Sequence, residues 1–523
     1  MRANTRKVVS ILAVASILMS GCGKSQEEIA QEEKETITSD FSVSYDGIKT
    51  ANFVAGTSVH DPSILEADGK YYIYGSHMSA AESEDLRTWK SMTGGYSYSS
   101  DNQVYGKLYD SKGPFAFTGK ANSVIKTDGN DVRLWAPDVK YSEKIGKYYM
   151  YFCTTSNYYT STVCYATADS PEGPFEWKGN LIYSGFSEQV LDKTNVLDYV
   201  DKTYVEDNYL NGGVSYNNSK WPNALDPTIF WDKDGRMWMT YGSWSGGIFL
   251  LEINEETGEA IHPEADPEND VDPYFGKRLI GGGHTSIEAP YILYDSVSDY
   301  YYLFVSYGNL QRTGGYQIRV FRSKTPDGNY EDMNGKAPKL GAGNPKTFGL
   351  KLSGNYMLPS LNMAYMATGH NSAFAAKDGK RYVVYHSRFE KKGEVHEPRV
   401  HQYLTNEEGW PCMLPYETDG EEVNASGYNK EEIIGEYYVI NQGTDVSADI
   451  AEPFKLVLTQ NGNVFGKSTT GIWEQKEGSY QMHITYGGKE YSGVFCKMKD
   501  EAGTNCIVFS AVGGNESVWG VKY

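Results

Sequence analysis

The sequence predicts an all-β protein, made of a five-bladed β-propeller followed by a small β-barrel or sandwich domain. Two observations support this fold class. A hairpin-like unit recurs five times between residues 61 and 385, and repetition of a multi-strand unit is typical of a radial β array. The repeats stop near Trp410, and shorter alternating runs then continue to the C-terminus. With about four strands to a unit, five units make a five-bladed propeller.

The clearest copy of the repeat spans residues 223–243. A β-rich run follows Asp226-Pro227, turn residues follow Trp231, and a second β run starts at Met237, which is the pattern of a hairpin. Because proline lacks the N–H that a central strand needs, it marks the point where a strand begins. The first strand of each blade lines the central channel of a propeller, so we expect the five starts to face one another. The other four copies start at Asp61-Pro62, Ala136-Pro137, Ala289-Pro290 and His370-Asn371.

Composition and pattern divide the chain into five parts. Residues 1–22 combine basic residues, a short apolar stretch and small residues before Cys22, which are the features of a signal peptide. Residues 23–45 are acidic and polar, and we expect them to form a flexible tether. Residues 46–416 hold the propeller, residues 417–430 a polar linker, and residues 431–523 a C-terminal β-barrel domain.

The segment before Cys22 resembles a bacterial lipoprotein signal, in which the cysteine is lipidated and becomes the mature N-terminus. A diacylated Cys22 would hold the protein stably at a membrane. The resemblance therefore predicts a lipoprotein anchored at the cell surface, on the extracellular face. Ordinary secretion with an incidental cysteine is the alternative.

Composition also limits the partners. The formal net charge of −20 argues against nucleic acid and anionic surfaces, so contact with a membrane is expected through the lipid anchor only, and we expect a monomer. The sequence has 43 Tyr against 19 Phe, and tyrosine suits both half-buried sheets and stacking on sugars. Cys153 with Cys164, and Cys496 with Cys506, could pair across hairpins or remain buried thiols.

Three of the five repeat starts bring a carboxylate to the channel. These are Asp61, Asp226 and Glu288, which directly precedes Ala289. Two carboxyl groups that flank a bond, one protonated and one ionised, are the machinery of glycoside hydrolysis, and repulsion between neighbouring carboxylates raises the pKa of one of them. The alternative is that these acids cap blade turns, where Asp is common. Three acids at equivalent starts favour the catalytic interpretation.

Six motifs carry a resemblance to a known family. Together they resemble glycoside hydrolase family 43, and among its members the endo-acting α-1,5-L-arabinanases. The resemblance covers residues 59–415 and implies inversion of anomeric configuration, and the C-terminal domain is similar to an accessory domain of larger arabinanases. The motifs are Val59-His-Asp-Pro-Ser, Leu134-Trp-Ala-Pro-Asp-Val, Asn223-Ala-Leu-Asp-Pro, Gly242-Ser-Trp-Ser-Gly-Gly-Ile, Ser286-Ile-Glu-Ala-Pro and Gly369-His-Asn-Ser-Ala.

The resemblance also implies residue roles. Asp61 is then the general base, Glu288 the general acid, and Asp226 the residue that modulates pKa and orients. His370 matches a histidine that binds one metal ion, usually Ca²⁺, together with water. Trp135 would offer a sugar an apolar platform, and packing between blades is the alternative for it. The residues expected to line the central sugar subsite are Trp135, Asn223, Ser243, Trp244 and Ser286.

Three functions remain open at this point. The first is an inverting endo-arabinanase that acts on plant cell-wall arabinan or arabino-oligosaccharides. The second is an exo-acting arabinofuranosidase or β-xylosidase of the same family. Residues 185–222 decide between these two, because we expect them to form a loop at the rim of the active site that closes or extends the groove. The third is a non-catalytic surface lipoprotein that binds glycans, which would predict loss of a channel acid.

Overall fold

The computed structural model describes residues 24–37, 41–54, 56–93, 102–109, 112–119, 133–339 and 347–523. It forms two compact units, Met1–Asp40 and Phe41–Tyr523, which are described separately. Cys22 and the rest of the predicted signal peptide lie outside the described residues. Within the described part of the chain, no helix has the length and apolar character needed to cross a membrane.

The first unit contains helix α1 (Gln26–Thr36), in the segment that we expected to be a flexible tether. The physical reason is a capping box at its start: the Ser25 side chain accepts from the backbone N–H of Glu28, and the Glu28 carboxylate accepts from the N–H of Ser25 at 2.7 Å. Such boxes satisfy two otherwise unpaired donors. Glu27 and Glu28 in the first turn also interact favourably with the helix dipole, so the acidic composition favours a helix here.

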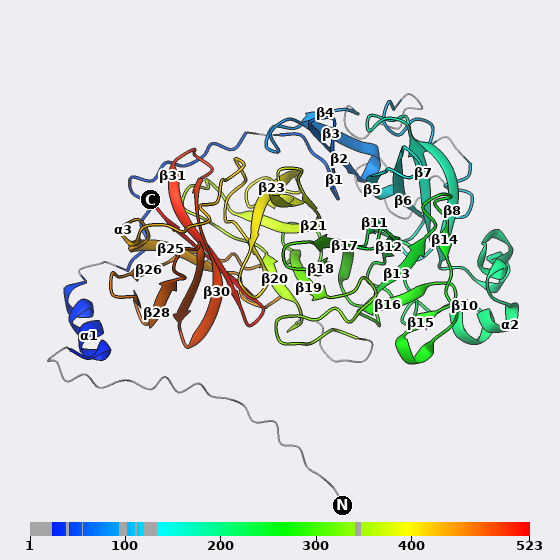
Figure 1. Ribbon diagram of the computed structural model, residues 1–523. Helices are drawn as coiled ribbons and strands as arrows, with labels where there is room; N and C mark the ends of the chain where they lie inside the picture. Colours follow the sequence, from blue (N-terminus) through cyan, green and yellow to red (C-terminus); the bar gives the residue numbers. More distant parts are fainter. Residues whose placement is uncertain are drawn as a thin grey trace, which may run out of the picture. The chain divides into compact units, whose positions relative to one another are not determined.

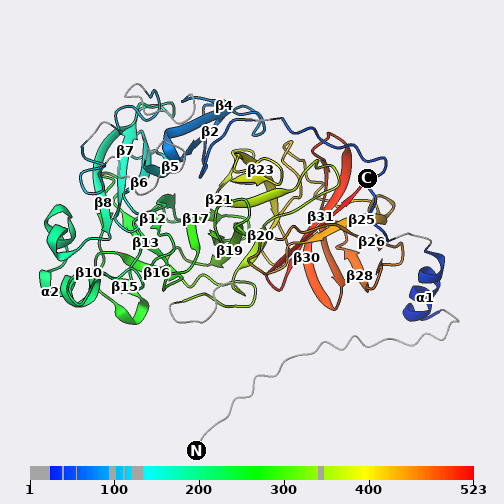
Figure 2. The same cartoon turned by 180° about the vertical axis from the view of Figure 1, so that it is seen from behind.

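Five antiparallel sheets form the blades of the propeller, in chain order around the channel (Figures 1 and 2). Their strands are β1 (Ser63–Ala67), β2 (Lys70–Gly75), β3 (Ser79–Ser83) and β4 (Lys90–Ser91); β5 (Leu134–Ser142), β6 (Lys147–Thr155), β7 (Ser161–Ala168) and β8 (Glu176–Ser184); β11 (Thr228–Trp231), β12 (Met237–Tyr241), β13 (Ile248–Ile253), β14 (Ala260–Ile261), β15 (Val271–Asp272) and β16 (Gly276–Ile280); β17 (Ile287–Asp295), β18 (Tyr300–Tyr307), β19 (Gln317–Ser323) and β20 (Leu350–Ser353); and β21 (Tyr365–Ala375), β22 (Arg381–Phe389), β23 (His396–Thr405) and β24 (Pro411–Met413).

The innermost strands close into a ring. Strand β1 contacts β5, β5 contacts β11, β11 contacts β17, β17 contacts β21, and β21 returns to β1. The predicted five-bladed propeller is therefore confirmed. Buried side chains fill the spaces between blades; for example, Tyr74 and Met150 belong to one apolar cluster that joins the first two blades.

The five blade starts share one unusual backbone conformation. A left-handed residue, with φ between 40° and 55°, stands at the same place in every blade. This conformation costs about 1–3 kcal/mol for a residue other than glycine and persists only where the surroundings hold it. In the second, fourth and fifth blades, a bulge in the pairing of the first two strands accompanies it. The left-handed residues are Asp61, Ala136, Asp226, Ala289 and His370.

Side chains of the preceding blade hold most of these starts in place. The backbone N–H of Ala136 donates to Ser76 Oγ at 2.9 Å, and that of Ala289 donates to Asp226 Oδ2 at 3.2 Å. The N–H of His370 donates to Ser306 Oγ at 2.7 Å. These bonds satisfy buried donors that the bulged strand cannot pair within its own sheet.

Residues 185–222 form a packed lobe, which differs from the rim loop that we expected. Their elements lie at the periphery of the propeller beside β8 and β15, as both views show (Figures 1 and 2). The physical reason is a set of apolar side chains, including Leu191, Tyr209 and Trp221, that pack with Phe249 and Phe275 of the third blade in one cluster. The elements are η2 (Glu188–Lys193), η3 (Val196–Asp198), α2 (Lys202–Tyr204), η4 (Val205–Tyr209), β9 (Leu210–Asn211) and β10 (Ser215–Tyr216).

The C-terminal strands form a closed barrel, as predicted. The short helix α3 (Lys430–Ile433) leads into it. Two single-turn 3₁₀ helices belong to the propeller, η1 (Ser76–Met78) and η5 (Pro267–Asn269). The barrel strands are β25 (Gly435–Asn441), β26 (Phe454–Leu458), β27 (Asn463–Gly466), β28 (Thr470–Gln475), β29 (Gln481–Tyr486), β30 (Lys489–Lys499), β31 (Asn505–Gly513) and β32 (Glu516–Lys522).

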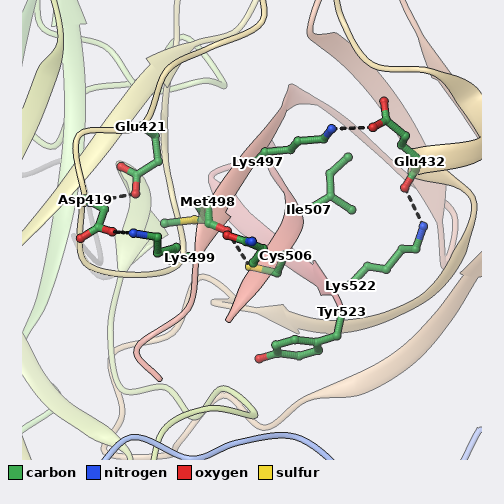
Figure 3. A pocket seen from close by; sticks show the side chains of 11 residues that line it. Asp419, Glu421, Glu432, Lys497, Met498, Lys499, Cys506, Ile507, Lys522 and Tyr523 are labelled. Carbon is green, nitrogen blue, oxygen red and sulfur yellow. Dashed lines mark hydrogen bonds and ion pairs between the residues drawn. The ribbon is translucent and has the colours of Figure 1, made fainter. Parts of the chain in front are cut away.

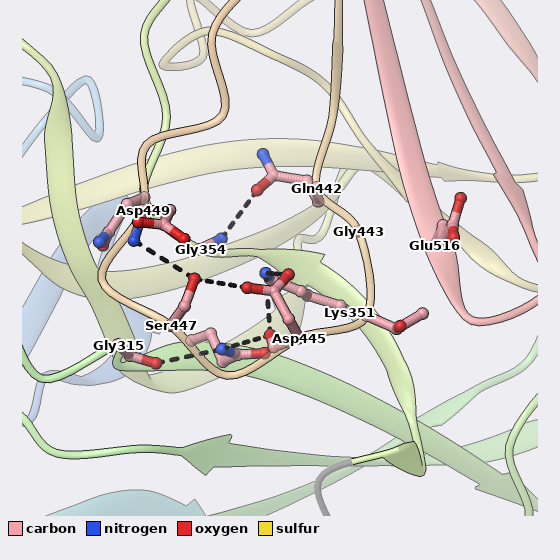
Figure 4. A network of polar contacts seen from close by, with 12 residues as sticks. Gly315, Lys351, Gly354, Gln442, Gly443, Asp445, Ser447, Asp449 and Glu516 are labelled. Carbon is pink, nitrogen blue, oxygen red and sulfur yellow. Dashed lines mark hydrogen bonds and ion pairs between the residues drawn. The ribbon is translucent and has the colours of Figure 1, made fainter.

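Barrel and propeller share one apolar core. The fully buried Trp519 of β32 packs edge-on against Tyr356, with ring centroids 5.1 Å apart, in a cluster that also holds side chains of the fourth and fifth blades. A polar network borders this core (Figure 4), in which Lys351 Nζ of β20 donates to the carbonyl oxygen of Asp445 at 3.1 Å. Burial lowers the pKa of Lys351 to about 8, although Asp445 opposes the shift. The two domains are thus packed as one folded body within residues 41–523.

A second polar region lies between the ends of β30–β32 and α3. It is a cavity of about 600 Å³ (Figure 3), where Lys499 pairs with Asp419 at 2.7 Å and Lys522 Nζ donates to the carbonyl oxygen of Glu432 at 2.6 Å. Cys506 lies beside it and is a free thiol. The other described cysteines, Cys153, Cys164, Cys412 and Cys496, are also buried free thiols, so of the alternatives left open by the sequence the structure has unpaired cysteines.

Candidate active site

Asp61 is held by hydrogen-bonding groups on both carboxylate oxygens. His370 Nδ1 lies 2.9 Å from Oδ1, His60 Nδ1 lies 2.8 Å from Oδ2, and the hydroxyl of Ser76 donates to Oδ2. Burial alone would raise the pKa of Asp61, but the charges and hydrogen bonds of His370 and His60 lower it well below its usual range. Asp61 is therefore ionised at neutral pH, as a general base must be.

His370 is the charge partner of Asp61. Burial alone would lower its pKa, but Asp61, with smaller contributions from Asp226 and Glu288, raises it to about 9. The imidazole and the carboxylate thus form a buried ion pair at the head of the channel. The contribution of His370 to stability is complete below its unfolded pKa of about 6.5 and is lost as the pH rises through about 9.

Glu288 is oriented by three donors. The hydroxyl of Tyr316 donates to Oε1 at 2.6 Å, Trp244 Nε1 donates to Oε2 at 2.7 Å, and Ser243 Oγ donates to Oε2 at 3.2 Å. Each carboxyl oxygen therefore has a fixed partner, and the group is only partly exposed. Hydrogen bonds of this kind hold the reactive carboxyl group of Glu288 in one geometry.

Asp226 lies close enough to the other acids for its ionisation to depend on them. Burial raises its pKa to about 7; His370 opposes the shift, and the charges of Glu288 and Asp61 add to it. Asp226 also accepts from the N–H of Ala289, the residue directly after Glu288. The structure thus brings Asp61, Asp226, Glu288 and His370 together at one end of the channel, with their ionisation coupled.

The expected sugar-binding residues lie around these acids. Asn223 is buried, and its Nδ2 donates to the carbonyl oxygen of Ser243 at 2.8 Å. Trp135 is half-buried and stands directly before a left-handed residue, as Glu288 does. Its ring lies against His77 and Tyr158, with centroids 6.2 and 5.7 Å away. Ser286 is half-buried next to the start of β17, where its carbonyl oxygen accepts from Gly308.

Several residues at the site carried no sequence signal strong enough to identify them. Ser76 and Tyr316 contact the two acids. Ser76 ends the Tyr-Gly-Ser run that the first repeat shares with the third, which was a signal for it, whereas Tyr316 belongs to no repeated motif. His386 accepts from the backbone N–H of Asp61 at 3.3 Å, and its ring stacks on His60 at 4.4 Å. His60 directly precedes Asp61, and this adjacency was the signal available for it.

The residues around His370 are compatible with a bound cation. Its Nδ1 faces Asp61, and its Nε2 has no hydrogen-bond partner among the described residues. A metal-ligating histidine usually directs its other ring nitrogen to a carboxylate in this way. Within the described residues, one further group of side chains could share an ion: His60, Asp61 and His386, whose ligand atoms lie within 4.8 Å of one another.

A closed β-propeller with an ionised carboxylate and two further acids at one end of its channel has the groups that glycoside hydrolysis uses. The comparisons with known proteins place the chain in the class of glycoside hydrolases. The model of the glycosyl hydrolases family 43 matches residues 50–220 and 206–411, and a C-terminal lipocalin-like domain matches residues 415–520. The chain belongs to glycoside hydrolase family 43.

Individual relatives are similar over nearly the whole chain. Extracellular endo-α-(1→5)-L-arabinanase 2 of Bacillus subtilis is 38% identical, with 89% of this chain and 93% of the relative covered. The extracellular endo-α-(1→5)-L-arabinanase of Thermotoga petrophila is 36% identical, with 89% of this chain and 93% of the relative covered. The crystal structure of endo-1,5-α-L-arabinanase from T. petrophila superposes with a TM-score of 0.76 at 34% identity, covering 91% of this chain and 100% of that chain.

Proposed function

We propose that the protein is an endo-acting, inverting hydrolase of the α-1,5-L-arabinofuranosidic bonds in arabinan. The observation that carries the proposal is the pair of carboxyl groups held by separate partners at one end of the channel: Asp61 is kept ionised by two histidines, and Glu288 is fixed by Tyr316 and Trp244. The substrate class is supported by the two relatives, which are named as endo-arabinanases and match almost the whole chain.

In the proposed reaction Asp61 takes a proton from a water molecule, which attacks the anomeric carbon. Glu288 gives its proton to the glycosidic oxygen as the bond to that carbon breaks. Attack from the face opposite to the leaving group inverts the configuration, which requires the two carboxyl groups to be roughly 6.5–9.5 Å apart to admit the water. Asp226 accepts a hydrogen bond from the backbone N–H of Ala289, the residue after Glu288, and interacts electrostatically with Glu288. Asp226 therefore orients the general acid.

Endo action is favoured over exo action by the place of residues 185–222. The lobe packs against the third blade through Phe249 and Phe275, and we propose that it leaves open the channel end where the acids meet. An open groove lets a polymer bind along its length, whereas a closed end admits only a chain terminus.

The proposal is tested by hydrolysis of debranched arabinan, with xylan as the control substrate. The wild type should release arabino-oligosaccharides from arabinan and nothing from xylan. Asp61→Asn and Glu288→Gln should each lose several orders of magnitude in rate while unfolding at nearly the wild-type temperature. Release of xylose by the wild type, or full activity in either variant, would contradict the proposal.

We further propose that His370 holds one Ca²⁺ ion through Nε2 of its neutral ring, with water completing the coordination, so that binding of the ion displaces the proton that the imidazole carries in the metal-free protein. Calcium prefers oxygen ligands, so an imidazole as the one protein ligand leaves the other positions to water. The cation would supply positive charge that offsets the repulsion among the three carboxylates. Elemental analysis should find about one calcium per chain, and chelation should lower the unfolding temperature of the wild type but not that of His370→Ala. Metal-free wild type with full stability would contradict this.

We also propose that the protein is extracellular and anchored by a lipid on Cys22. The named relatives are described as extracellular, which supports the location. The anchor depends on the sequence alone, on the small residues before Cys22, and its test is given in the Discussion.

A further inference from the structure

Two buried rings lie between the acid and the base of the proposed mechanism. Tyr316 is 1% exposed and donates its hydroxyl to Glu288, and His386 is fully buried and accepts from the backbone N–H of Asp61. The two rings stack, with centroids 5.9 Å apart and planes 20° from parallel. A continuous line of contacts therefore runs from Glu288 through Tyr316 and His386 to Asp61.

The site has little freedom to place Tyr316 differently. A Cβ on Gly369 would lie only 2.2 Å from Cδ1 of the Tyr316 ring, a distance at which one of the two groups must move. Gly369 directly precedes His370, the ion-pair partner of Asp61. Position 369 is thus glycine because the Tyr316 ring occupies the space that a side chain there would need. The backbone next to His370 is therefore packed directly against the tyrosine that holds Glu288.

His386 is rigid for a similar reason. Its ring stacks on the ring of His60, with centroids 4.4 Å apart, and also on the ring of Tyr316. Its Nδ1 accepts the backbone N–H of the left-handed residue Asp61 at 3.3 Å.

We propose that Tyr316 and His386 act as a spacer that fixes the distance and angle between Glu288 and Asp61. The inference rests on the acid and base roles proposed above. In an inverting enzyme this separation decides whether a water molecule fits between base and sugar, and an error of about 1 Å in such a geometry can cost about 100-fold in rate. Tyr316 and His386 are positioning residues, because they act through the two carboxylates.

The variant that isolates the spacer is Tyr316→Phe. It keeps the ring, its stack on His386 and its contact with Gly369, and removes only the hydroxyl that holds Glu288. The loss of a hydrogen bond to a charged group predicts a fall in kcat of about 10- to 100-fold, with KM on arabinan changed less than twofold.

Gly369→Ala tests the same spacer from its other side. The new methyl group should displace the Tyr316 ring and lower kcat at least as much as Tyr316→Phe. The double variant should show less than the product of the two losses, because both changes act on one contact. The matched control is Tyr356→Phe, a buried tyrosine whose hydroxyl lies 3.4 Å from that of Tyr385; its kcat should stay within twofold of wild type.

The inference is overturned if Tyr316→Phe keeps wild-type kcat, or if Tyr356→Phe loses as much activity as Tyr316→Phe. Asp61→Asn and Glu288→Gln are measured in the same assay. If those two variants stay active, the proposed acid–base roles fail, and the spacer fails with them. If they are inactive while Tyr316→Phe is normal, the spacer alone is wrong.

Discussion

Asp226 is predicted to lower the stability of the protein in a way that depends on pH. Its pKa is about 7 in the folded state, whereas an exposed aspartate has a pKa of about 3.9. Each pKa unit is worth about 1.4 kcal/mol, so the ionised side chain costs on the order of 4 kcal/mol in the folded protein. Asp226 is 8% exposed, so solvent screens this cost only weakly.

The sign follows from proton binding. Between about pH 4 and pH 7 the folded state binds the proton of Asp226 more tightly than the unfolded state, so stability falls as the pH rises through this window and is level above it. Asp226→Asn removes the titration. The free energy of unfolding of the variant, relative to wild type, should therefore increase by about 2–3 kcal/mol between pH 5 and pH 8.

The assay is denaturant unfolding of wild type and Asp226→Asn at both pH values, together with arabinan hydrolysis. The variant should be more stable than wild type at pH 8 and nearly inactive. Asp232→Asn is the control: Asp232 is also buried, but Trp238 Nε1 and the N–H of Arg236 donate to it, which lowers its pKa against the effect of burial. That variant should be less stable by about 1–3 kcal/mol at both pH values. A difference for Asp226→Asn that did not grow with pH would refute the reasoning.

Three further predictions concern other parts of the molecule. Trp519→Ala should lower the free energy of unfolding by about 3–5 kcal/mol. Because Trp519 packs against Tyr356 of the propeller, calorimetry should show one transition at a lower temperature. An unchanged propeller transition with separate melting of the barrel would contradict this. Trp135→Ala should raise KM on arabinan several-fold with little loss of stability, whereas destabilisation with unchanged kinetics would place its role in packing. Cys22→Ser should stay unprocessed or be released into the medium, and a variant still processed and membrane-bound would contradict the lipid anchor.

The blades could be predicted from the sequence because their determinants are local. In four of the five repeats, a proline after Asp61, Ala136, Asp226 or Ala289 is left out of the strand pairing at the same place, and the alternating β runs that follow bury one face or both. The left-handed conformation at these positions could not be predicted, because Asp, Ala and His rarely adopt it without support. The support comes from side chains such as Ser76 and Ser306, which belong to the neighbouring blade.

The same limit applies to the site. Asp61, Asp226, Glu288 and His370 were identifiable because each marks a repeat start. Tyr316 lies beyond the end of the second strand of the fourth blade, where no pattern marks it, and its bond to Glu288 is visible only in three dimensions. Residues 185–222 appeared polar in sequence, yet their few apolar side chains are spaced so that the folded lobe buries them together.

The most direct test of the central claim is the anomeric form of the first product. Proton NMR of debranched arabinan, followed from the first seconds after wild-type enzyme is added, distinguishes the two anomers of the new reducing end before they equilibrate. If Asp61 activates a water molecule while Glu288 protonates the leaving oxygen, the β-anomer must appear first and the α-anomer only later, by mutarotation. Initial appearance of the α-anomer would mean that a carboxylate attacks the sugar directly, and would contradict the mechanism.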